Sequence, residues 1–159
     1  MADFTNLLHP DAIISPLAAE SRQQIIRQMS DRLGEITGLD SRDILEAVME
    51  RERLGSTGVG EGVAIPHARV PGIDKAVGAF ALLETPCDFE AMDDHQCDLI
   101  FMLLAPEGAG ADHLRALAHV SREFRQSELR TELRAALRSD AGETAVRDLL
   151  LGDATGAAA

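Results

Sequence analysis

The chain has 159 residues, of which 45% are hydrophobic and 3% aromatic, with neither Trp nor Tyr. This composition supplies one compact core but hardly two, and its small apolar side chains favour a layered α/β packing in a single domain. The formal net charge of -12 argues against a nucleic acid or an anionic membrane as partner, because both would repel this surface, and favours a basic or neutral protein.

Two helices are predicted in the first part of the chain. From Ser21 to Gly38, apolar residues recur at the spacing of one helix face, and Gly38 stands where a helix would end. Asp40 and Ser41 form a start signal for a second apolar stripe, which ends at Gly55.

The segment that follows is rich in glycine. Residues 55–62 hold four glycines in eight positions, which precludes a stable helix and predicts a loop with unusual backbone angles. Residues 63–65 are a short strand candidate that Pro66 stops, and His67 follows where this strand gives way to another loop. Such strand ends are common places for reactive residues.

The middle of the chain predicts the centre of a sheet. Residues 76–83 and 97–104 are short apolar runs typical of central strands covered on both faces by helices. Between them, residues 93–96 predict a turn and residues 89–92 an edge strand.

The last part of the chain is predicted to be helical. After a break at residues 106–110, Asp112 is expected to cap a helix that ends near Phe124, and two further helices are expected at 127–137 and 143–151. The final stretch has too little apolar material to pack. We therefore expect one domain over residues 1–151 and a disordered tail over residues 152–159.

The cellular location follows from the cysteines and the N-terminus. Cys87 and Cys97 are too few for a disulfide framework and lie in apolar, strand-like surroundings, which indicates a reducing compartment. Residues 1–8 lack the features of an export signal, and no stretch approaches the roughly 20 apolar residues of a membrane span. The sequence therefore predicts a cytoplasmic protein without membrane insertion.

The segment from Arg51 to Arg69 carries the candidate chemistry. Glycines allow backbone N–H groups to crowd toward an anion, hydroxyl groups add donors, and Arg51, Arg53 or Arg69 can neutralise charge. A neutral imidazole such as His67 can attack a phosphoryl group directly, with Pro66 fixing the backbone beside it. The sequence therefore predicts a phosphohistidine site at His67, with a phosphate-binding loop made of Ser56, Thr57, Gly58 and Gly60.

Other catalytic motifs fit less well. A P-loop needs Lys followed by Ser or Thr, which residues 55–62 do not supply, and a serine-hydrolase elbow needs a residue between Gly55 and Ser56. The dinucleotide fingerprint links a strand to a helix, whereas this loop precedes a strand. We expect neither cofactor nor metal, since zinc-like paired spacings are absent among Cys87, His95, Cys97, His113 and His119.

Residues 55–60 and 62–67, Gly-Ser-Thr-Gly-Val-Gly and Gly-Val-Ala-Ile-Pro-His, resemble the phosphorylation motif of the IIA proteins of the phosphoenolpyruvate phosphotransferase system. The resemblance is to the mannitol and fructose class, and particularly to its nitrogen-related regulatory branch. It covers residues 7–151 and places His67 on the phosphorylated histidine. By the same resemblance His113, which follows Asp112 at a helix start, is the partner imidazole, and Arg51 is the phosphate-side arginine.

The resemblance implies a mixed sheet flanked by helices on both faces. It also implies that His67 receives phosphate from a histidine-phosphorylated carrier of the HPr type, and that the phosphorylation state changes binding to regulatory protein targets. Glu61 departs from the family, in which an uncharged residue is usual at this position, and a carboxylate there would disfavour a nearby phosphate. Our hypothesis is that the Glu61 side chain points outward.

Several alternatives stay open from the sequence. The protein could be a sugar-specific IIA component that passes phosphate to a IIB partner, or a regulator that binds proteins without any chemistry. Arg51 could be a solvated helix-end cation, and Ser56 and Thr57 could only satisfy turn backbone. Homodimer formation and the nitrogen of His67 that is modified are also undecided.

Overall fold

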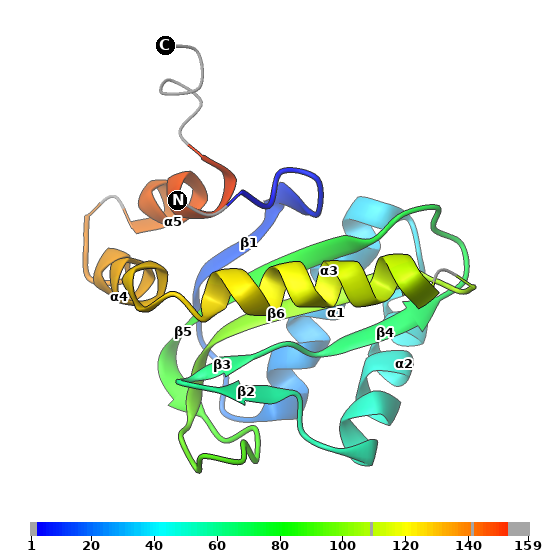
Figure 1. Cartoon of the computed structure of the whole chain (residues 1–159), viewed down its shortest axis with the longest axis horizontal. Helices are drawn as coiled ribbons and strands as arrows, with labels where there is room; N and C mark the ends of the chain where they lie inside the picture. Colours follow the sequence, from blue (N-terminus) through cyan, green and yellow to red (C-terminus); the bar gives the residue numbers. More distant parts are fainter. Residues whose placement is uncertain (1–2, 109, 141, 153–159) are drawn as a thin grey trace.

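A computed structural model describes residues 3–108, 110–140 and 142–152 of the chain. Its centre is a six-stranded sheet with the order β1-β5-β6-β3-β2, and β4 also pairs with β6 (Figure 1). Apart from Gly152, the predicted tail lies outside the described residues. The strands are β1 Leu8–Leu17, β2 Gly58–Gly60, β3 Val63–Ala64, β4 His67–Val70, β5 Val77–Cys87 and β6 Cys97–Pro106.

The sheet is mixed. Strands β5 and β6 are antiparallel, whereas β1 runs parallel to β5. Strands β3 and β4 both run parallel to β6, one after the other, with Ala64 opposite Ile100 and His67 opposite Leu103. Pro66 interrupts them, because it has no N–H, but its carbonyl oxygen still accepts a hydrogen bond of 2.9 Å from the Leu103 amide. His67 therefore begins a strand, which corrects the loop expected there.

Helices cover both faces of the sheet, as the sequence predicts. In Figure 1, α3 crosses in front of the sheet, and α1 and α2 lie behind it. Helix α1 packs on β1 and β5, α2 on β4, and α3 on β6, whereas α5 packs on β1 and α4 on α5. The helices are α1 Arg22–Thr37, α2 Ser41–Leu54, α3 Gly110–Phe124, α4 Ser127–Ala136 and α5 Gly142–Leu151.

The helix ends follow the capping residues in the sequence. The Ser21 side chain accepts a hydrogen bond from the Gln24 amide at the start of α1, and Gly38 ends that helix with a φ of 81°. The Asp40 carboxylate accepts from the Arg42 amide at the start of α2. Helix α3 begins at Gly110, so Asp112 lies in its first turn and does not cap it.

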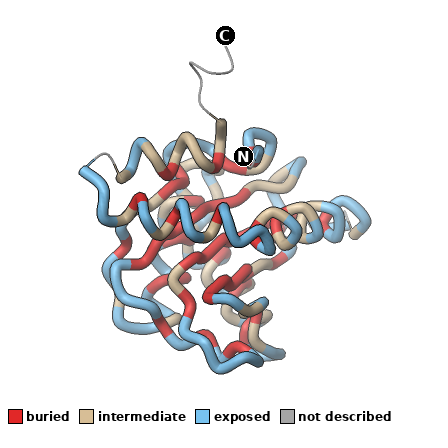
Figure 2. The backbone as a smooth tube through the Cα atoms, turned by 60° about the vertical axis from the view of Figure 1, so that its left-hand side comes forward, coloured by how far each residue is buried: buried red, intermediate tan, exposed pale blue. Residues whose placement is uncertain are grey.

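The core lies between the two helical layers. Strand β6 is buried from Leu99 to Ala105 and β5 from Gly78 to Leu83, which agrees with the prediction of central strands (Figure 2). Cys87 and Cys97 are both buried free thiols. In the ranges that the structure describes, no helix has the length and hydropathy to span a membrane.

Two segments differ from the sequence prediction in strand content. Strand β1 was not predicted, because Pro10, Pro16 and its exposed polar residues break the apolar alternation of an edge strand. Residues 89–92 were expected to form a strand and do not: Glu90 has a φ of 55°, and its amide donates to the Asp88 side chain at 2.7 Å. The glycine segment contains the short strand β2, where we expected only loop.

The turn between β2 and β3 has the unusual backbone angles that its glycines predict. Gly60, Glu61 and Gly62 have φ values of 99°, 58° and 81°. Arg134 of α4 donates a hydrogen bond of 2.8 Å to the Glu61 carbonyl oxygen and also binds the Asp98 carboxylate at 2.8 and 2.9 Å. The hydrogen bond to Glu61 ties the tip of the hairpin to α4, and the ion pair ties α4 to the start of β6.

Gly62→Ala is expected to lower the free energy of unfolding by roughly 2–4 kcal/mol. A Cβ at this position would occupy the space of the Arg134 guanidinium and lie 2.9 Å from the Asp98 carboxylate, at a φ that disfavours any side chain. Urea denaturation measures the loss. Gly108→Ala is the matched control: it has a similar φ of 83° but no described atom within 4 Å of a Cβ, so about 1 kcal/mol is expected. Equal losses in the two variants would contradict the crowding.

Candidate functional site

His67 is held at the first position of β4 by a hydrogen bond to the chain just before it. Its Nδ1 lies 2.8 Å from the carbonyl oxygen of Ile65. A carbonyl oxygen can only accept, so Nδ1 carries the proton and Nε2 keeps its lone pair. The ring is half-buried. The structure therefore presents an oriented imidazole with an unprotonated nitrogen.

His113 lies beside His67, although 46 positions separate them in the sequence. It projects from the first turns of α3, is only 8% exposed, and has its ring centroid 5.4 Å from that of His67, with 50° between the ring planes. Its Nδ1 is buried and has no hydrogen-bond partner among the described residues. The structure thus brings together the two histidines that the sequence analysis paired.

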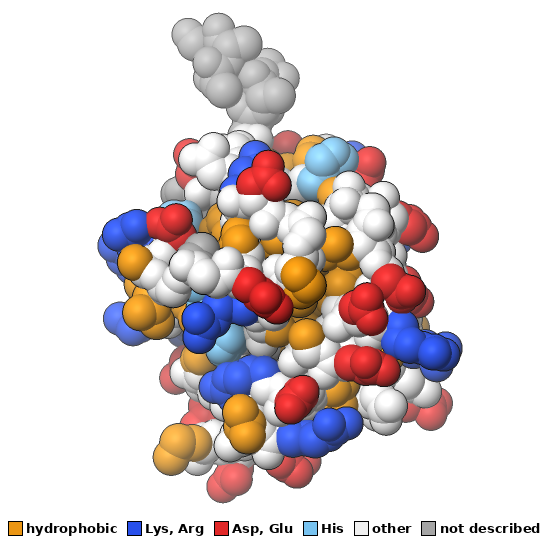
Figure 3. Space-filling view, turned by 90° about the vertical axis from the view of Figure 1, so that its right-hand side faces the viewer, with side chains coloured by type: hydrophobic (Ala, Val, Ile, Leu, Met, Phe, Trp, Pro, Cys, Tyr) orange, Lys and Arg blue, Asp and Glu red, His pale blue; other side chains and the backbone are white. Residues whose placement is uncertain are grey.

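A surface hollow lies over the two imidazoles. Arg51 of α2 and Arg69 of β4 line it together with His67, His113 and Glu50, so its lining carries two positive charges and one negative charge beside the histidine pair. Exposed Leu54 and Leu114, and the partly buried Leu117, add an apolar rim to this hollow. Figure 3 shows the face where basic, hydrophobic and histidine side chains gather.

A second, smaller hollow shares Arg51 and His67 with the first. It is lined by the start of the glycine segment, including Ser56, Thr57 and Gly58, and by Ser121 of α3. Gly60 is not part of either hollow; it lines a separate depression with Arg125 and Arg130. The structure therefore brings Gly58 near His67 and leaves Gly60 apart.

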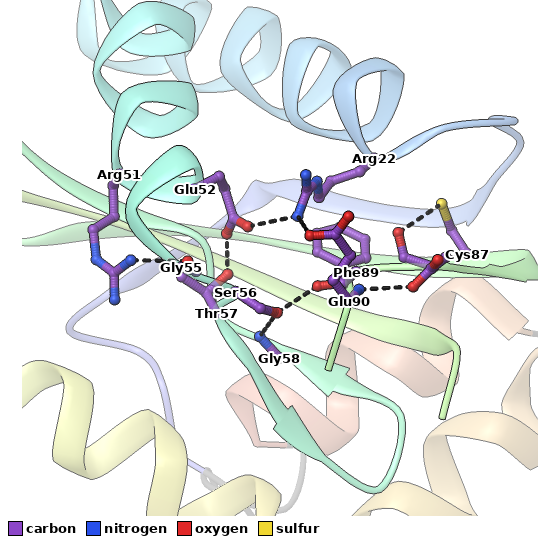
Figure 4. A network of polar contacts seen from close by, with 11 residues as sticks. Arg22, Arg51, Glu52, Gly55, Ser56, Thr57, Gly58, Cys87, Phe89 and Glu90 are labelled. Atoms are coloured by element: carbon purple, nitrogen blue, oxygen red, sulfur yellow. Dashed lines mark hydrogen bonds and ion pairs between the residues drawn. The ribbon is translucent and has the colours of Figure 1, made fainter. Parts of the chain in front are cut away.

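Arg51 is partly committed to its own helix. Its Nη1 donates a hydrogen bond of 3.0 Å to the carbonyl oxygen of Gly55, where α2 ends (Figure 4). This bond satisfies one of the free carbonyl groups at a helix C-terminus. Arg51 also lines both hollows, so it serves as a helix-end cation and as a charge beside His67.

The hydroxyl groups of the glycine segment are bonded within the protein. Ser56 Oγ donates to the carbonyl oxygen of Phe89 and accepts from the Gly58 amide at 3.0 Å. Thr57 is buried, and its Oγ1 donates to the carboxylate of Glu52 (Figure 4). These bonds agree with the alternative in which both hydroxyls satisfy the turn and do not face an anion.

The Glu61 side chain is exposed at the tip of the hairpin. Its backbone is fixed on both sides, since its amide donates to Asp93 at 3.0 Å and its carbonyl oxygen accepts from Arg134. Glu61 lines neither hollow at His67. This position agrees with the hypothesis of an outward side chain.

Sequence reasoning missed two kinds of residue at this site. Leu117 and Ser121 follow His113 at intervals of four, so the helical period alone places them on the same face of α3, and both line the second hollow. Glu52 gave no such signal, because a Glu in a charged helical segment is normally exposed. Its carboxylate is nevertheless buried beneath the glycine segment.

Both imidazoles are shifted toward the neutral form. Burial lowers the pKa of His67; the bond to Ile65 opposes this shift and the Arg51 charge adds to it. Burial also lowers the pKa of His113, and the nearby His67 and Arg69 act in the same direction. At neutral pH the Nε2 lone pair of His67 is therefore free to attack an electrophile.

Comparisons with known proteins agree in family and fold. The family model of the phosphoenolpyruvate-dependent sugar phosphotransferase system, EIIA 2, matches residues 6–143. A nitrogen regulatory protein of Bradyrhizobium diazoefficiens is 46% identical over 133 residues, covering 84% of this chain and 87% of that protein. A fructose-specific EIIA component of Haloferax volcanii is 41% identical over 113 residues, or 70% of this chain and 71% of that protein. The crystal structure of nitrogen regulatory protein IIA-Ntr from Neisseria meningitidis matches with a TM-score of 0.80 and 33% identity, covering 92% and 97% of the two chains.

An NMR titration of the histidine rings from pH 8 to pH 5 tests the shifts. His67 and His113 should take up protons only below the ordinary histidine pKa of about 6.5, because burial disfavours their charged forms. Their contribution to stability is then fully present above pH 6.5 and is lost as the pH falls through the lower folded-state pKa values. Blocked histidine in the same buffer is the reference, and a midpoint at or above its value for either ring would contradict this environment.

Proposed function

The chain belongs to the EIIA type 2 family of the phosphoenolpyruvate-dependent sugar phosphotransferase system, and from that premise we propose that it carries a phosphoryl group on Nε2 of His67. One observation carries the proposal: the Ile65 carbonyl oxygen accepts a hydrogen bond from the Nδ1–H of a half-buried imidazole, which leaves Nε2 as the nucleophile. His113 and Arg51 stand beside that ring.

The proposed transfer balances without a further reactant. The Nε2 lone pair of His67 forms a bond to phosphorus as the bond from phosphorus to the donor nitrogen breaks, and that electron pair returns to the donor imidazole. Arg51 and Arg69 neutralise charge on the phosphoryl oxygens. His113 donates a hydrogen bond from Nε2 to one of these oxygens. Its buried Nδ1 has no hydrogen-bond partner among the described residues, so the proton of the neutral ring is better placed on Nε2.

The surface around the hollow supports a protein as phosphoryl donor. The side chains of Leu54 and Leu114, at its edge, are 81% and 67% exposed. A small-molecule donor bound in the hollow would leave both side chains exposed, whereas a protein donor could cover them. Exposed apolar groups next to charged ones are typical of surfaces that bind proteins. We therefore propose that an HPr-type carrier, phosphorylated on histidine, docks over this rim.

The relatives support a regulatory role. The protein of Bradyrhizobium diazoefficiens and the structure from Neisseria meningitidis both carry the name nitrogen regulatory protein. A phosphoryl group adds a strong negative charge and several acceptors at the centre of the hollow. In our proposal this change selects which regulatory proteins bind the same face.

The fructose-specific relative favours a second candidate function, in which the chain passes its phosphoryl group to a sugar-specific IIB partner. The discriminating measurement is the rate of transfer from the phosphorylated chain to purified IIB domains. The regulatory proposal expects slow transfer to every IIB domain, whereas one fast acceptor would establish the second function.

His67→Ala should abolish labelling when the chain is incubated with labelled phosphoenolpyruvate, the general phosphotransferase enzyme and its carrier. His113→Ala should keep the label at His67 but slow its uptake by roughly 100-fold or more, as expected for loss of one positioned donor. Peptide mapping locates the label.

His119→Ala is the matched control, because His119 lies on the same helix, its ring nitrogen contacts the Asp3 carbonyl oxygen, and it lines neither hollow. It should be labelled at the normal rate. Persistent labelling of the His67 variant would refute the site. If the wild-type chain takes up no label, the phosphoryl-carrier proposal is wrong and a regulator that only binds proteins is the alternative.

A further inference from the structure

A buried carboxylate lies directly beneath the glycine segment. Glu52 of α2 is only 4% exposed, and its Oε1 accepts the hydrogen bond from Thr57 Oγ1. Its Oε2 is 3.4 Å from Nη1 of Arg22 on α1, which also approaches Glu90 at 3.9 Å (Figure 4). Burying a carboxylate is costly unless it is paired and hydrogen-bonded, and Arg22 and Thr57 supply both. The fold thus keeps a buried carboxylate whose Oε1 binds the hydroxyl group of Thr57.

Thr57 in turn connects to the reactive histidine through the backbone. The Ile65 amide donates a hydrogen bond of 3.0 Å to the carbonyl oxygen of Thr57. The carbonyl oxygen of the same Ile65 accepts a hydrogen bond from His67 Nδ1, which lies 2.8 Å away. A continuous series of hydrogen bonds therefore runs from Glu52 through Thr57 and Ile65 to the imidazole.

We propose that Glu52 and Thr57 are positioning residues that fix the tautomer of His67 by holding the Ile65 carbonyl oxygen against Nδ1. This inference rests on the proposed function only in its kinetic consequence. Neither side chain needs to touch the phosphoryl group, since Glu52 lines neither hollow and Thr57 has its hydroxyl turned into the bond with Glu52.

The tautomer matters because only one ring nitrogen can attack. The hydrogen bond made by one nitrogen decides where the proton of a neutral imidazole resides. When the Ile65 carbonyl oxygen is held in place, the proton stays on Nδ1 and Nε2 is free. When Ile65 relaxes, part of the population carries the proton on Nε2, and that fraction cannot accept a phosphoryl group.

Position matters in the same way as protonation. Residues 63–70 are fixed to β6 on one side, through β3 and β4, and Thr57 holds Ile65 at the break between those strands. Pro66 has no N–H with which to restrain the break itself. The hydrogen bond to the Thr57 carbonyl oxygen is therefore the contact that fixes the Ile65 amide.

The test compares Thr57→Val with Thr57→Ser. Valine keeps the side-chain volume of threonine but lacks the hydroxyl group, whereas serine keeps the hydroxyl group. The nitrogen NMR shifts of His67 report its tautomer in the unphosphorylated protein. Thr57→Val should show a measurable population with the proton on Nε2, and labelling should slow in proportion to the fraction of His67 that loses its free Nε2, about twofold where half of the population does. Thr57→Ser should restore both readouts.

Thr37→Val is the matched control. The Thr37 hydroxyl is also partly buried and donates a bond of 2.7 Å, but to Leu33 at the end of α1, away from both hollows. This variant should keep the wild-type tautomer and rate. Glu52→Gln keeps the volume and replaces the charged acceptor with a neutral one, so we expect a smaller shift in the same direction. If Thr57→Val does not fold, the tautomer of His67 in Glu52→Gln tests the positioning role instead.

The possible outcomes separate this inference from the proposed function. An unchanged tautomer in Thr57→Val, or in Glu52→Gln where that variant decides, overturns the positioning role. The positioning role is also overturned if Thr57→Ser has the same altered tautomer and slow labelling as Thr57→Val. If the wild-type chain accepts no label while Thr57→Val still shifts the tautomer, the proposed function fails and the positioning role holds.

Discussion

The hydrogen bond between His67 Nδ1 and the Ile65 carbonyl oxygen is the contact on which this account depends. It couples the chemistry of a side chain to the rigidity of a sheet, because the residues on either side of Ile65 are paired with buried β6. Pro66 separates the two short strands while its own carbonyl oxygen remains bonded to β6. The backbone thus sets both the direction of the ring and the nitrogen that stays free.

Three elements then complete the surroundings of that ring. The C-terminus of α2 brings Arg51, β4 brings Arg69, and the first turns of α3 bring His113. The arginines keep positive charge at the hollow in a chain whose formal net charge is -12. Burial lowers the pKa of both imidazoles and so favours their neutral forms beside these charges. The combination suits an incoming phosphoryl group, for which the site offers a neutral nucleophile and fixed positive charge.

Local signals in the sequence sufficed for much of this arrangement. Capping residues fixed the ends of α1 and α2, and apolar runs identified β5 and β6. Features that depend on distant partners escaped. The hydroxyls of Ser56 and Thr57 look like anion ligands until Phe89 and Glu52 are placed next to them. Strand β1 is stabilised by pairing with β5 and not by its own pattern, and the burial of Glu52 depends on Arg22 from another helix.

The most direct test of the account is to phosphorylate the nitrogen-15-labelled wild-type chain and determine which imidazole nitrogen is bonded to phosphorus. We expect a phosphorus–nitrogen coupling at Nε2 of His67, with the proton still on Nδ1. A coupling at Nδ1 of His67, or at any other histidine, would contradict it, because the Ile65 carbonyl oxygen would then not be what selects the reacting atom.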